Sequence, residues 1–113
     1  MATVRRYCGR TILEVQNGYV KEYCGSYLFQ IDGDRVKRNC GNYLYEINGT
    51  MIKQYCGGYL FEFDGKRLKR YCGNYIAEVD GNYIKEYCGG YLYEISGFLS
   101  QKELMALLAI LFD

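Results

Sequence analysis

Hydrophobic and polar residues alternate along most of the chain, in short runs that two kinds of turn separate. The runs span about six residues and are rich in Tyr, Leu, Ile, Val and Phe, as in residues 58–63 and 66–71. Asp-Gly or Asn-Gly pairs follow one set of runs, and Cys-Gly pairs stand eight residues later. Asn, Asp and Gly tolerate the positive φ of a two-residue type I′ turn. The pattern therefore predicts strands paired as antiparallel hairpins.

The pattern repeats every sixteen residues through six copies. Two strands of six residues and two turns of two residues account for this period. The first repeat places its turn one residue later, at Gln16-Asn17-Gly18. The fold expected is mostly β: an antiparallel up-and-down meander of about twelve short strands, formed by six hairpin repeats, plus one C-terminal α-helix. We expect a hairpin-repeat domain over residues 1–96 and an apolar helical segment over residues 97–113. The repeats are marked by Cys8, Cys24, Cys40, Cys56, Cys72 and Cys88, and the other turns by Asp32-Gly33, Asn48-Gly49, Asp64-Gly65 and Asp80-Gly81.

The alternation assigns one face of the predicted sheet to the core and the other to water. The uncharged central row is Val4, Leu13, Val20, Phe29, Val36, Tyr45, Ile52, Phe61, Leu68, Ala77, Ile84 and Tyr93. The row assigned to water alternates cations and aliphatic residues: Arg5, Ile12, Lys21, Leu28, Lys37, Leu44, Lys53, Leu60, Lys69, Ile76, Lys85 and Leu92.

Closure of this sheet into a barrel is disfavoured by the predicted turns. A barrel needs strand register to stagger around its circumference. Hairpins of equal length accumulate almost no stagger unless bulges at the Cys-Gly turns supply it. We therefore expect the ribbon to fold over on itself or to face another chain.

The segment after the last repeat predicts a helix over residues 101–112. Ser100 can cap its first turn while Glu103 reaches back, and Leu99 can pack on Leu104. A helix that is apolar almost all round needs burial on several sides. We therefore predict a homo-oligomer, with the chain as its own partner. The predicted interface is Leu104, Met105, Leu107, Leu108, Ile110, Leu111 and Phe112.

Two parts of the chain resemble known bacterial sequence families. Residues 97–104, Gly-Phe-Leu-Ser-Gln-Lys-Glu-Leu, followed by aliphatic residues, are similar to short C-terminal (SHOCT) segments. That resemblance implies a role in oligomerisation or tethering, although the Lys-rich middle of such helices is missing. The tandem Tyr-Cys-Gly-x-Tyr-Leu-x-Glu-Ile-x-Gly hairpins over residues 4–96 resemble four-fold beta-flower proteins. This second resemblance implies a four-fold arrangement, so a tetramer is favoured, and it brings no activity or catalytic residue.

Composition narrows the classes of function. Lys and Arg number 14 against 13 Asp and Glu, without blocks of like charge, which argues against a nucleic-acid partner. The sequence has no His, the side chain best suited to proton transfer near neutral pH. No apolar run reaches the ~18 residues of a membrane-spanning helix, and the N-terminus lacks a secretory signal. We expect a cytoplasmic protein without membrane insertion.

The six cysteines are interpreted as small turn residues. Equivalent turns lie two strands apart, about 9.6 Å, which is too far for a disulfide. No Cys-x-x-Cys pair indicates zinc, so no metal and no cofactor is predicted. A thiol site formed by oligomerisation is the alternative interpretation.

Tyrosines and arginines at one margin of the predicted core face form a possible ligand face. Such residues can stack on bases or sugars, or they can be ordinary cross-strand pairs. The residues of this Tyr/Arg margin are Tyr27, Arg38, Tyr43, Tyr59, Arg70, Tyr75 and Tyr91.

The sequence therefore favours a non-enzymatic homo-oligomeric scaffold or interaction module. The alternative is a ligand-binding module for a carbohydrate, a nucleobase or another small molecule, using the Tyr/Arg margin or a cavity between subunits. Enzymatic activity is not expected, because the repeated Glu and Lys rows are typical of a solvated surface.

Overall fold

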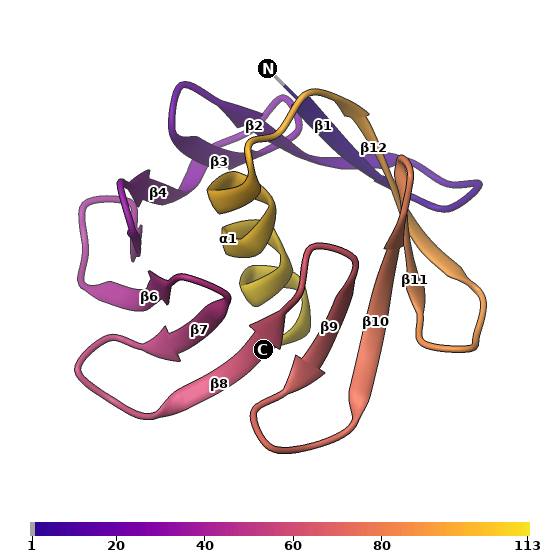
Figure 1. Ribbon diagram of the computed structural model, residues 1–113. Helices are drawn as coiled ribbons and strands as arrows, with labels where there is room; N and C mark the ends of the chain where they lie inside the picture. The colour runs from indigo at the N-terminus through magenta and orange to yellow at the C-terminus, as the bar shows by residue number, and fades with distance from the viewer. Residues whose placement is uncertain (1) are drawn as a thin grey trace.

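A closed antiparallel sheet surrounds a single helix in the computed structural model, which describes residues 2–113 (Figure 1). Twelve strands and helix α1 (Gln101–Phe112) follow one another along the chain. The strands are β1 (Ala2–Arg6), β2 (Thr11–Gln16), β3 (Tyr19–Glu22), β4 (Tyr27–Asp32), β5 (Arg35–Arg38), β6 (Tyr43–Asn48), β7 (Met51–Gln54), β8 (Tyr59–Phe63), β9 (Arg67–Arg70), β10 (Tyr75–Asp80), β11 (Tyr83–Glu86) and β12 (Tyr91–Gly97).

Each strand pairs with the next along the chain, and β1 pairs with β12 to close the barrel. The predicted meander of twelve strands with a C-terminal helix is thus confirmed. The prediction that the ribbon does not close is wrong. Closure needs stagger, and the hairpins themselves supply it.

The register of the first hairpin shows the source of this stagger. Val4 pairs with Leu13, and Leu13 pairs with Glu22. The equivalent of Val4 in the next repeat is Val20, so Glu22 lies two residues further along the chain. Each hairpin therefore displaces its neighbour along the strand axis, and six displacements in the same direction allow the sheet to close.

The displacement arises because most turns lie one residue later than the sequence suggests. Asp32 pairs with Arg35, which leaves Gly33 and Asp34 as the two-residue loop. Gly33 has φ 63° at the first loop position, as a type II′ turn requires. The first repeat differs, since both Asn17 and Gly18 have positive φ there, as in type I′.

A bulge at the end of each Cys-Gly turn changes which side chains face the core. Val20 pairs with Phe29, but Lys21 pairs with Tyr27, so Leu28 is an extra residue. Leu28 and Phe29 both pack against the core, while the Tyr27 ring lies beside Lys21 on the outer wall. The assignment of the aliphatic row to water is therefore wrong. Its members Ile12, Leu28, Leu44, Leu60 and Ile76 are partly buried against the core.

The central row predicted for the core does face inward. Ten of its members are buried, including Val4, Val20 and Ile84 at 0% exposure, while Phe29 and Tyr93 are partly buried. Side chains of an eight-stranded barrel just fill its interior, so a twelve-stranded barrel leaves more room. Helix α1 occupies this room (Figure 1).

Helix α1 is fixed at both of its ends. The predicted capping box is present, with Ser100 Oγ accepting from the Glu103 amide at 3.2 Å and Glu103 Oε1 accepting from the Ser100 amide at 2.9 Å. Lys102 bridges to Asp34 in the turn before β5. At the far end, Tyr45 in β6 donates a hydrogen bond to Asp113.

The barrel wall covers the helical surface that the sequence assigns to a second chain. Met105, Leu107 and Leu108 are fully buried inside their own barrel. The other predicted interface residues, Leu104, Ile110, Leu111 and Phe112, are partly buried. Burial of the helix thus needs no partner chain. Over residues 2–113, no helix is both long and apolar enough to cross a membrane.

Candidate ligand-binding site

One turn of the barrel carries a charge that its five equivalents lack. Arg10 closes the turn between β1 and β2. The equivalent residues of the later Cys-Gly turns are small or uncharged: Ser26, Asn42, Gly58, Asn74 and Gly90. A charged residue found in one of six equivalent turns distinguishes that turn from the rest of the repeat.

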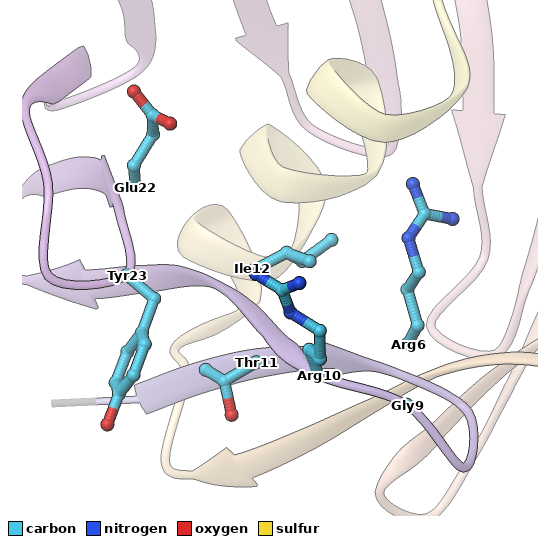
Figure 2. Close-up of a pocket in the computed structure, with 7 residues that line it drawn as sticks. All are labelled: Arg6, Gly9, Arg10, Thr11, Ile12, Glu22 and Tyr23. Carbon is cyan, nitrogen blue, oxygen red and sulfur yellow. The ribbon is translucent and has the colours of Figure 1, made fainter.

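Beside this turn lies a hollow of about 560 Å³, the first-turn hollow (Figure 2). Two other hollows on the described chain have volumes of about 140 Å³ and 190 Å³. The first-turn hollow is lined by Arg6, Gly9, Arg10, Thr11, Ile12, Glu22 and Tyr23.

Backbone hydrogen bonds hold Arg6 and Arg10 on opposite sides of a narrow turn. The Arg6 amide donates to the Arg10 carbonyl at 3.0 Å, and the Gly9 amide donates to the Arg6 carbonyl at 2.8 Å. Glycine avoids crowding at position 9, since a Cβ there would lie 3.1 Å from the Arg6 Cβ. The backbones of the two arginines are therefore held side by side across the turn.

Neither of these guanidinium groups forms an ion pair with any residue in the described range 2–113. Their neighbour Arg5 differs, because it bridges to Glu94 and donates to the Gly9 carbonyl at 3.2 Å. Unpaired guanidinium groups bind carboxylates and phosphates through paired N–H donors. Arg6 and Arg10 are thus available to an anion.

Glu22 and Ile12 complete the same side of the hollow. Glu22 pairs with the inward-facing Leu13, which places its carboxylate at the barrel mouth. Ile12 packs against the core and gives the hollow an apolar wall. Figure 2 shows Arg6 and Glu22 extending to one side of the sheet, and Thr11 and Tyr23 to the other. The lining therefore has a charged inner side and an outer side with a phenol ring.

The structure separates the members of the predicted Tyr/Arg margin. The bulges place the tyrosines on the outer wall, where Lys37 and Arg35 lie 5.6 Å from the Tyr43 ring centre. Arg70 instead lies over the ring of core residue Phe61, at 5.9 Å. Arg38 and Arg70 belong to the inner margin of the mouth, because they pair with inward-facing residues. The tyrosines on the outer wall are Tyr27, Tyr43, Tyr59, Tyr75 and Tyr91.

Sequence reasoning missed Arg6 and Arg10, although the signal was present. Alignment of the six repeats shows Arg10 as the charged residue in a column of Ser, Asn and Gly. The backbone hydrogen bond between Arg6 and Arg10 could not be predicted from the sequence, because it depends on the register of the strands.

The six turn cysteines are exposed and free. All have φ between 54° and 56°, a left-handed conformation that is uncommon for residues other than Gly, Asn or Asp. The neighbouring Cys8 thiol raises the pKa of the Tyr7 hydroxyl, and Cys72 does the same for Tyr71. Among the described residues, no three His, Cys, Asp or Glu side chains gather as a metal site would require.

Comparison of the chain with known protein families, curated proteins and solved structures finds no match. The resemblances to beta-flower proteins and to SHOCT segments stay hypotheses.

Proposed function

We propose that this protein is a non-enzymatic binding module that takes a small anionic ligand at the first-turn hollow. The observation that carries the proposal is Arg10, a guanidinium group found in one of six equivalent turns and unpaired with any residue of the described chain. Its neighbour Arg6 supplies a second donor group, so the turn can hold one carboxylate or phosphate group from two sides.

Glu22 narrows the ligands that suit this hollow. Its carboxylate repels further negative charge, which favours a single anionic group over a polyanion. Ile12 offers apolar contact to the remainder of a small molecule. A compact organic anion therefore fits the lining better than a nucleic-acid backbone does.

The test follows backbone amide shifts by NMR while acetate or inorganic phosphate is added to the full chain. We expect saturable shifts at residues 6–12 and residue 22. Arg10→Asn should weaken binding about ten-fold, the usual effect of losing one charge-assisted hydrogen bond. The fold should tolerate this change, since Asn42 and Asn74 occupy equivalent positions.

A gain-of-function variant gives the matched control. Asn74→Arg places a guanidinium group beside Arg70, in a turn followed by Tyr75 and Ile76 and opposed by Glu86. It should add a second anion site with shifts at residues 70–76. Absence of shifts at residues 6–12 with both anions, or unchanged binding in Arg10→Asn, would refute the proposed function.

A second candidate function is a homo-oligomeric scaffold, supported by one exposed ring. Phe98 is 80% exposed between β12 and helix α1. It lines a hollow of about 190 Å³ together with Val79, Ile95 and Leu104. Two copies related by a two-fold axis can each place Phe98 in the hollow of the other, which is the geometry of an isologous contact.

Light scattering tests this scaffold at micromolar protein concentration. Phe98→Ser should convert a dimer or a tetramer to a monomer, because the change removes the exposed ring. Tyr27→Ser is the control, since it removes an exposed ring from the outer wall instead. A wild-type protein that is monomeric throughout would exclude the scaffold and leave the anion site untouched.

A further inference from the structure

Pairs of tyrosine rings recur on the outer wall of the barrel. In four of these pairs, one ring comes from the start of an even-numbered strand and the other from the Cys-Gly turn that follows the neighbouring strand. Four pairs have ring centres 5.0–5.2 Å apart: Tyr43 with Tyr55, Tyr59 with Tyr71, Tyr75 with Tyr87, and Tyr91 with Tyr7. Offset aromatic pairs at this separation attract each other.

The first hairpin lacks one ring of its pair. Thr11 stands where the other repeats have a tyrosine, and the expected partner ring is that of Tyr23. The Tyr23 amide donates to the Ile12 carbonyl at 3.1 Å, as the Tyr55 amide does to Leu44 at 3.0 Å. Tyr23 therefore holds its usual place on the wall and is 51% exposed.

A second irregular repeat shows how the chain fills such a gap elsewhere. Asn39 replaces the turn tyrosine that would pair with Tyr27. There Tyr19 supplies a ring at 5.0 Å from Tyr27. The equivalent of Tyr19 in the first hairpin is Thr3, which has no ring. Within residues 2–113, no aromatic ring or cation packs on Tyr23 at the distances found for the other pairs.

A cation flanks the same vacant place. Lysine ammonium groups lie 5.6–5.9 Å from the ring at this position in four repeats, as with Lys37 over Tyr43 and Lys69 over Tyr75. The residue equivalent to these lysines is Arg5, which pairs with Thr11. A ring placed beside Tyr23 would thus meet a guanidinium group on its other flank, and arginine favours contact with aromatic faces.

We infer that this vacant place, the ring gap between Thr11, Tyr23 and Arg5, binds a planar aromatic ring of a small molecule. The gap has the size of a phenol ring, because a tyrosine ring occupies the equivalent place in five repeats. The flanking cation favours neutral or anionic aromatic rings over cationic ones. Thr11 and Tyr23 also line the first-turn hollow, but they extend away from Arg6 and Glu22 (Figure 2), so the ring gap lies on the other side of the sheet from these charged groups.

The test uses p-cresol, which has the ring of a tyrosine side chain, and cyclohexanol as a non-aromatic control. NMR of the full chain should show saturable shifts at residues 11 and 23 with p-cresol, and at least five-fold weaker shifts with cyclohexanol. Thr11→Tyr should abolish the response by filling the gap. This variant restores the residue type of the other repeats, so its melting temperature should not fall.

Tyr59→Thr is the matched gain-of-function variant, because it opens the same gap beside Tyr71. It should create a second p-cresol response at residues 59 and 71. Equal responses to p-cresol and cyclohexanol, or an unchanged response in Thr11→Tyr, would overturn the inference. Arg10→Asn should leave the p-cresol response unchanged, which separates failure of this site from failure of the anion site.

Discussion

The hydroxyl group of Tyr45 donates a hydrogen bond to Asp113 Oδ2 at 2.5 Å. Tyr45 belongs to the inward-facing row of β6, and Asp113 is the C-cap residue of helix α1. This bond joins two residues 68 positions apart in sequence. It fastens the free end of the helix to the wall, whereas the capping box and Lys102 fasten the other end.

Tyr45→Phe should therefore reduce the free energy of unfolding by about 1 kcal/mol, the usual contribution of one hydrogen bond. Urea denaturation followed by circular dichroism measures the change. Tyr93→Phe is the matched control, because Tyr93 occupies an equivalent inward position in β12. A larger loss for Tyr93→Phe than for Tyr45→Phe would contradict this role of the Tyr45–Asp113 bond.

The same contact predicts the alkaline limit of stability. Burial raises the pKa of Tyr45 well above its ordinary value, and the hydrogen bond to Asp113 and its negative charge act in the same direction. A raised folded-state pKa means that the neutral phenol stabilises the native state fully below the unfolded pKa of about 10. Stability should fall as pH rises above that value. Denaturation midpoints measured from neutral to alkaline pH should drop less in Tyr45→Phe than in the wild type.

Leu108→Ala should reduce the free energy of unfolding by about 2–5 kcal/mol, the range for a large side chain removed from a packed core. Leu108 is fully buried between helix and wall. Leu111→Ala should reduce it less, because Leu111 is partly buried. Light scattering should show the same mass for Leu108→Ala and wild type. A dissociated Leu108→Ala variant with unchanged stability would instead place this side chain between chains.

Gly89 and Gly90 offer a test of the turn geometry with adjacent residues. A Cβ at Gly89 would lie 2.9 Å from the Glu86 Cβ, whereas nothing lies within 4 Å of a Cβ at Gly90. Gly89→Ala should reduce the free energy of unfolding by about 1–3 kcal/mol, as overpacked sites do, and Gly90→Ala should have little effect. Thermal denaturation of both variants measures these changes. Equal losses of stability in the two variants would contradict the crowding expected at Gly89.

All six cysteines should react with a water-soluble thiol reagent in the native protein, because each is free and exposed. The absorbance of the product that the thiol reagent releases gives the number of reactive thiols, measured in the absence of denaturant. Cys56→Ser should lower the count by one. A native count below that of the denatured protein would show that some turn thiols are covered in the assembled state.

Local sequence signals located the helix and the strands because these elements follow from neighbouring residues. Ser100 and Glu103 form the predicted capping box, and the helix spans the residues expected. Alternation placed Val4, Val20 and Ile84 in the core. The candidate site was less visible: the repeat alignment marks Arg10, but the register alone shows that its backbone meets Arg6.

Closure was missed through a small error in turn position. The pair Asp32-Gly33 suggested one loop, but Gly33 and Asp34 form it. A shift of one residue in the turn keeps every side chain on its face and moves the pairing by two residues. Repeated at the four Asp-Gly and Asn-Gly turns, that displacement separates an open ribbon from a closed barrel.

The sequence by itself determined the strands, their repeat, the inward-facing row and the helix, since each depends on contacts among residues close along the chain. The tertiary structure decided that the sheet closes, that the helix lies inside it, and that Tyr27 faces outward while Leu28 faces the core. These outcomes depend on register accumulated around a whole circumference. Each hairpin shifts the strand register only slightly, but these shifts add up around the barrel. No single stretch of sequence therefore reveals whether the sheet closes.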